Sequence, residues 1–107
     1  METITKHIPL EDLLIQLAEE AAELAQAASK YHRAIRGTNP TPVSQSGARL
    51  ALIEEVADVN VAAEAVRMKL GILCDEIAVV EDEKIERWKK RIRTEAEDES
   101  QDTVARH

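Results

Sequence analysis

Apolar residues recur at steps of three and four along the first third of the chain. This spacing places them on one face of a helix, because an α-helix makes one turn in about 3.6 residues. Pro9 suits the first turn of such a helix, and Gly37 suits its end. The pattern predicts one long amphipathic helix, whose apolar stripe is Leu10, Leu13, Leu14, Leu17, Ala21, Leu24, Ala28, Tyr31 and Ile35.

Two more helices are predicted downstream. Residues 37–47 are rich in Gly, Pro, Ser and Asn, which is typical of a loop. Helical spacing then resumes over about residues 48–70, and again over about residues 75–93. Residues 95–107 are polar and acidic with almost nothing to bury, so we expect an acidic flexible tail there.

The composition favours helices and limits the core. The chain has 107 residues, enough for one domain, but only one Trp, one Tyr and no Phe, so the core must be built from Leu, Ile, Val and Ala. We predict an all-α fold, a small helical bundle over residues 1–94 followed by the tail. Since the Ala-rich faces give one chain a thin core, we expect a homodimer or homotetramer.

The formal net charge is −7, which makes the chain a poor candidate for binding a nucleic-acid backbone. Cys74 is the only cysteine, so no internal disulfide can form and a reducing compartment is the simplest expectation. No apolar run approaches the roughly 20 residues of a membrane span, and the first residues lack the apolar core of a signal peptide. We therefore expect a cytoplasmic protein with no membrane or nucleic-acid partner.

Carboxylates stand three residues apart, about one helical turn, at Glu20 and Glu23 and again at Glu55 and Asp58. If the two helices pack face to face, four carboxylates meet, and they can share a site only with bound cations or protons. Hard oxygen ligands in this number suit Mg²⁺, with Mn²⁺ as a possible substitute. A plain solvated acidic face remains the alternative, because composition alone gives about four acidic pairs at this spacing.

The surroundings favour a metal site. No Lys or Arg occurs from His7 to Ser29 or from Leu50 to Val66, so these acids lack basic neighbours on their own helices. On the last helix, by contrast, acids precede bases by four residues, the favourable order for ion pairs. Those pairs are Glu83 with Arg87 and Glu86 with Lys90.

Other metals are disfavoured by the sequence. Helical di-iron sites use a Glu three residues before a His, and none of the three histidines has one. Zinc is disfavoured because Cys74 has no partner at ligand spacing.

The strings LAEEAAELAQAASKYHRA and LIEEVADVNVAAEAV resemble the MazG-like nucleotide pyrophosphohydrolases of the all-α NTP pyrophosphatase superfamily. That family's motif is E-E-x-x-E, a spacer, then E-x-x-D. The resemblance covers about residues 10–93, and the spacer here is longer than is usual in the family. The matching residues are Glu19, Glu20, Glu23, Glu55 and Asp58.

The resemblance implies Mg²⁺-dependent hydrolysis of an NTP or dNTP to the monophosphate and pyrophosphate. Its metal ligands would be Glu20, Glu23, Glu55 and Asp58, and Glu19 would hold or orient the attacking water. Such a substrate is itself the expected small-molecule partner.

Three further residues are candidates for substrate binding. Lys84 and Arg91 share a face of the last helix and would meet the phosphates, although both could be simply solvated. Asn60 is a polar amide in an apolar run and could contact the substrate. Trp88 fits the core stripe better than a base-stacking role.

Two other functions stay open at this point. The chain could be a non-catalytic acidic helical module that oligomerises or docks a basic partner. It could also be a regulatory homologue that has kept the fold and lost turnover.

Overall fold

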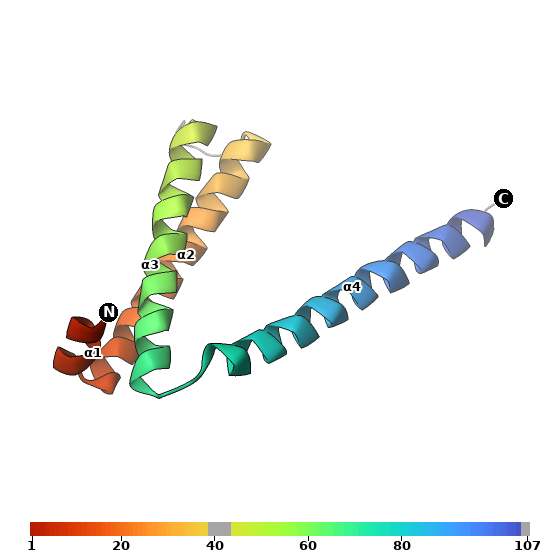
Figure 1. Cartoon of the computed structure of the whole chain (residues 1–107). Coiled ribbons are helices and arrows are strands. Elements are labelled where there is room, and N and C mark those ends of the chain that lie inside the picture. The colour runs from red at the N-terminus through yellow and green to blue at the C-terminus, as the bar shows by residue number, and fades with distance from the viewer. Residues whose placement is uncertain (39–43, 106–107) are drawn as a thin grey trace. The chain divides into compact units, whose positions relative to one another are not determined.

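The computed structural model describes residues 1–38 and 44–105, which form four α-helices and no strand (Figure 1). The all-α prediction is therefore confirmed. The chain divides into two units, Met1–Gly71 and Ile72–His107. The helices are α1 (Glu2–His7), α2 (Leu10–Arg36), α3 (Gln45–Lys69) and α4 (Cys74–Ala105).

The ends of α2 and α3 follow local chemistry. Gly37 has φ +72°, a left-handed conformation that glycine adopts at little cost, and α2 ends there as predicted. The Ser44 hydroxyl accepts a hydrogen bond from the Gly47 N–H at 3.0 Å. This cap lets α3 begin at Gln45, slightly before the predicted start. Part of the predicted loop, residues 39–43, lies outside the described residues.

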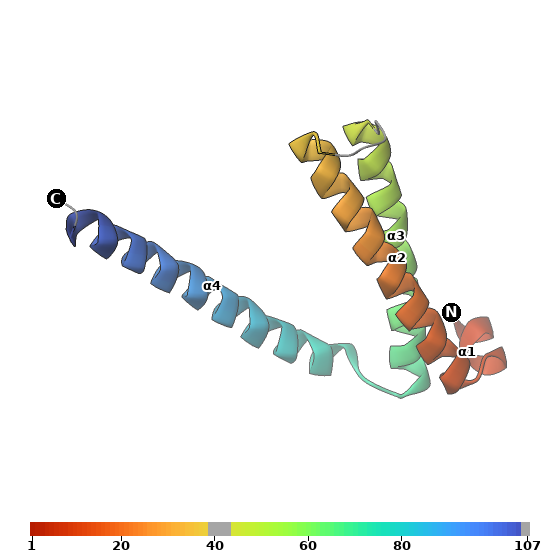
Figure 2. The same cartoon turned by 180° about the vertical axis from the view of Figure 1, so that it is seen from behind.

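Helices α2 and α3 lie side by side and run in opposite directions (Figures 1 and 2). Leu13 of α2 is buried against Ala65 and Val66 of α3, and this cluster is the centre of the core. Ala48 and Ala62 are also buried. Alanine side chains let two helix backbones approach closely, and the buried alanines of α3 serve this contact, whereas Ala21 and Ala28 of the predicted stripe are exposed.

The sequence pattern missed α1. This helix has six residues, too few to show a period, and so short a helix depends on tertiary contacts. It packs against α3, and the Lys69 Nζ donates a hydrogen bond to the Thr5 carbonyl at 2.6 Å. Helix α1 thereby covers the end of the α2–α3 pair.

The last helix differs from prediction in length and grouping. Residues 95–105, where we expect a flexible tail, continue α4 in the structure. This segment has no Gly or Pro and contains good helix formers, so a helix can persist there without burying side chains. Helix α4 belongs to a unit that begins at Ile72, and the predicted domain over residues 1–94 stays a prediction.

The predicted ion pairs on α4 are replaced by another. Glu86 pairs with Lys89 at 3.2 Å, three residues away, and not with Lys90. No ion pair forms between Glu83 and Arg87, both of which lie in the described part of the chain. None of the described helices is both long and apolar enough to cross a membrane.

Leu13 tests the α2–α3 core. Replacing Leu13 by Ala should lower the free energy of unfolding by about 2–5 kcal/mol, since it leaves a cavity at a side chain that is 3 % exposed. Leu14→Ala is the matched control; Leu14 is 46 % exposed, and its loss should cost less than about 1 kcal/mol. Urea denaturation at one protein concentration measures both. Equal losses would show that the core lies elsewhere.

Candidate metal centre

The pairing of α2 with α3 brings acidic side chains together. Oxygens of Glu20 and Glu23 on α2 and of Glu55 on α3 all lie within 4.8 Å of one another. Asp58 is outside this trio, but its charge raises the pKa of both Glu20 and Glu55. Three of the four predicted ligands therefore converge, and the fourth is their electrostatic neighbour.

Two oxygens of the cluster have no partner. Glu20 and Glu55 are partly buried, and the Oε2 atom of each is buried without a hydrogen bond. The other Glu20 oxygen, Oε1, accepts a hydrogen bond from the Gln16 Nε2 at 2.6 Å. A buried carboxylate oxygen without a donor or a cation is unfavourable, because it has lost water and gained nothing. A bound cation would stabilise such an oxygen.

Electrostatics in the cluster favours protonation. The pKa of Glu20 and of Glu55 is raised above the ordinary 4.5, first by desolvation and then by the negative charges of Glu23 and Asp58. The influence that lowers the pKa of Glu20 is the hydrogen bond from Gln16, a neutral group. The cluster therefore holds more negative charge than its own hydrogen bonds stabilise.

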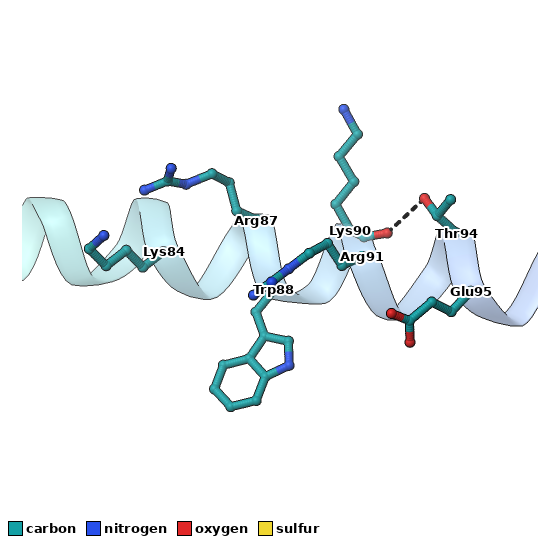
Figure 3. A pocket seen from close by; sticks show the side chains of 7 residues that line it. All are labelled: Lys84, Arg87, Trp88, Lys90, Arg91, Thr94 and Glu95. Carbon is teal, nitrogen blue, oxygen red and sulfur yellow. Dashed lines mark hydrogen bonds between the residues drawn. The ribbon is translucent and has the colours of Figure 1, made fainter.

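The remaining predicted site residues are not members of the trio. Glu19 is exposed on α2 and is not one of the converging carboxylates. Asn60 is exposed on α3. It follows Asp58 by two residues, a rotation of about 200° around the helix, so it lies away from the acidic face. Lys84 and Arg91 are on α4, in the other unit, where they line a hollow along that helix (Figure 3).

A cleft of about 290 Å³ beside the acidic cluster was not predicted. Its lining includes Ile4 and Ile8 of α1, Val61 of α3, and the carboxylate-bearing Glu20 and Asp58. The signal in the sequence was the four-residue step from Ile4 to Ile8, which is too brief to stand out before α1 is known. The cleft joins an apolar surface to two of the acids.

Comparisons with family models, with curated proteins and with solved structures find no match for this chain. The resemblance to the MazG-like hydrolases therefore rests on the two acidic motifs, and the geometry above is independent of it.

The raised pKa values predict a pH dependence of the metal-free protein. An acid whose pKa is raised on folding contributes stability below its unfolded pKa, and this contribution is lost as the pH rises through the folded pKa. In EDTA, the melting temperature of wild type should therefore fall relative to that of Glu20→Gln as the pH rises from about 4 to about 7.

Differential scanning fluorimetry across this range measures the gap between the two proteins. Glu54→Gln is the control, because Glu54 is exposed and is not one of the converging acids. Its gap to wild type should stay small at every pH. A constant gap for Glu20→Gln as well would contradict the electrostatic strain in the cluster.

Proposed function

We propose that this protein is a Mg²⁺-dependent nucleoside triphosphate pyrophosphohydrolase of the MazG type. The observation that supports the proposal best is the convergence of Glu20, Glu23 and Glu55, with one buried, unpartnered oxygen on each of Glu20 and Glu55. The resemblance of the two acidic motifs to those of the family supports the choice of reaction, hydrolysis of a nucleoside triphosphate.

The donor set fits the metal. Glu20, Glu23 and Glu55 offer hard carboxylate oxygens within reach of one ion, and Asp58 supplies further negative charge nearby. Neither nitrogen nor sulfur ligands belong to the group, which disfavours zinc. When bound there, Mg²⁺ would neutralise phosphate charge and lower the pKa of a water molecule.

The protein's own contribution is to fix and shield the acids. Two helices hold the trio, so its oxygens are positioned before any ligand arrives. Partial burial of Glu20 and Glu55 excludes water and strengthens electrostatic interactions within the cluster. Glu19 has an exposed carboxylate one residue from the trio, and in this proposal it orients the attacking water.

The apolar cleft is our candidate for the part of the substrate that carries no phosphate. Its volume of about 290 Å³ is near the lower end of small-molecule sites, which begin at about 300 Å³. Ile4, Ile8 and Val61 offer a surface against which a nucleobase can pack. Since Glu20 and Asp58 line the same cleft, a base held there would place its phosphates close to the acids.

The phosphates also need positive charge from the protein. The assignment of Lys84, Arg91 and Asn60 to substrate binding stays a prediction from the sequence, and Asn60 does not share the acidic face of α3. Several large apolar side chains of the first unit, such as Leu14 and Ile15, are exposed, which supports a bundle completed by a second copy.

The four carboxylates test the metal assignment. Changing Glu20, Glu23, Glu55 or Asp58 to the matching amide should abolish turnover, because the amide keeps the size of the side chain but loses its charge. Without metal, each change relieves repulsion, so the melting temperature should hold or rise. The increase in melting temperature produced by millimolar Mg²⁺ should shrink.

Glu54→Gln, a neighbouring acid outside the trio, is the matched control and should keep wild-type turnover. Losses of a few-fold or less in all four site variants, or an equal loss in the control, would contradict the assignment. If wild type shows no Mg²⁺-dependent rise in melting temperature, an acidic docking module becomes the better description.

The position of cleavage tests the reaction class. Hydrolysis between the α- and β-phosphates should release pyrophosphate and a nucleoside monophosphate, as the motif resemblance implies. Ion-exchange chromatography of the products from a set of NTPs and dNTPs, without added pyrophosphatase, measures this directly. Orthophosphate and a diphosphate as the first products would show that the chemistry is different.

A further inference from the structure

Helix α4 carries an apolar stripe that nothing in its own unit covers. All of the stripe residues are exposed, and the Trp88 side chain is 63 % exposed. The hollow in Figure 3 is walled by side chains of α4 alone, so it is a surface with no opposite wall. An uncovered stripe of this kind marks an interaction surface. Its members are Ile77, Val80, Ile85, Trp88 and Ile92.

The charges of α4 fall into three blocks. Residues 75–83 contain five acids and no base, residues 84–93 contain six bases and one acid, and residues 94–102 contain five acids and no base. The intrahelical pair of Glu86 with Lys89 neutralises little of this pattern. Like charges within one block repel each other, so each block is stabilised when an oppositely charged surface lies beside it.

We propose that α4 pairs antiparallel with α4 of a second copy, about a two-fold axis between residues 84 and 85. Parallel pairing would set each block against a block of the same sign. Antiparallel pairing about this axis sets residues 75–83 of one copy against residues 86–94 of the other, acid against base. The charge pattern therefore selects the orientation.

The same register also aligns the stripe. Positions that add up to about 169 lie opposite each other, so Ile77 of one copy faces Ile92 of the other. Asp82 approaches Lys89 of the second copy on one flank of the stripe, while Glu83 lies about 140° around the helix from the stripe and adds to the general negative charge opposite Arg87. The helices overlap over about 22 residues, or about 33 Å at 1.5 Å per residue.

A second antiparallel register also sets acids against bases, but it does not bring the apolar stripes of the two copies together. An axis near Thr94 would place residues 84–93 against the C-terminal acidic block. It would then put Trp88 opposite Glu99, and Ile92 opposite Glu95, leaving the apolar side chains facing acids. The axis between residues 84 and 85 brings stripe residues near stripe residues, Ile77 to Ile92 and Trp88 to Val80 beside Glu81, whereas the axis near Thr94 brings none together. This proposal does not depend on the proposed hydrolase activity.

Single thiols distinguish the two registers. In the full chain with Cys74→Ser, a thiol introduced by Lys84→Cys lies near the proposed axis and should form an intermolecular disulfide on mild oxidation. Thr94→Cys in the same background lies about ten residues from that axis and should cross-link at least about tenfold more slowly, since its two copies stand far apart. Non-reducing gels measure both. Faster cross-linking at position 94, or equal rates, would overturn the proposal.

Charge exchange tests the pairing itself. Asp82→Lys with Glu83→Lys in one chain, and Arg87→Glu with Lys89→Glu in another, each place like charges across the axis. Alone, each chain should pair through α4 roughly tenfold or more weakly than wild type, because residues 82 and 83 then face residues 87 and 89 of the second copy with like charge. Mixed, the two chains are complementary in both halves and should form heteropairs.

Native mass spectrometry of the two full-length chains, which differ in mass, measures heteropair against homopair. Circular dichroism confirms that each chain stays helical. Glu97→Lys with Asp98→Lys is the matched control, with the same charge change beyond the overlap, and should leave pairing unchanged. A mixture that pairs no better than either chain alone would overturn the proposal, whether α4 then covers its own chain or binds a different partner.

Discussion

The contact of α2 with α3 is the interaction on which the rest of the first unit depends. Leu13 packs against Ala65 and Val66, and the buried alanines of α3 let the two helices approach. The carboxylates of Glu20 and Glu23 meet that of Glu55 only because this contact fixes the rotation of both helices. A helix turned by one residue, about 100°, would carry its acids away from the partner.

The acidic cluster destabilises the same pair of helices whose hydrophobic packing assembles it. Hydrophobic packing brings negative charges together and partly removes them from water, which raises the pKa of Glu20 and Glu55. Surface carboxylates without these neighbours would simply be hydrated. A structure that keeps such a cluster between packed helices gains most when a cation binds, and this is the physical basis of the proposed metal centre.

Helix α4 illustrates the opposite situation. Over residues 74–101 it contributes no buried residue, and its apolar and charged side chains there are exposed. Packing within its own unit contributes little to the stability of such a helix. Pairing with a second copy would bury the stripe and neutralise the blocks together, which explains why both features share one register along the helix.

By itself, the sequence determined the all-α class, the course of α2 and α3, and the three acids that converge, with Asp58 wrongly expected as a fourth. Helical period, a capping glycine and the spacing of acids along one turn are local properties, so they can be read without a structure. The absence of bases around Glu20 and Glu55 was also local, and it singled out these acids among the many in the chain.

Only the tertiary structure decided what depends on contacts between distant segments. It set Asp58 beside the trio and outside it, because this outcome depends on the rotation of α3 against α2. It revealed α1 and the cleft that Ile4 and Ile8 line, since so short a helix exists through its packing on α3. It also extended α4 through residues 95–105, where helix propensity outweighed the lack of anything to bury.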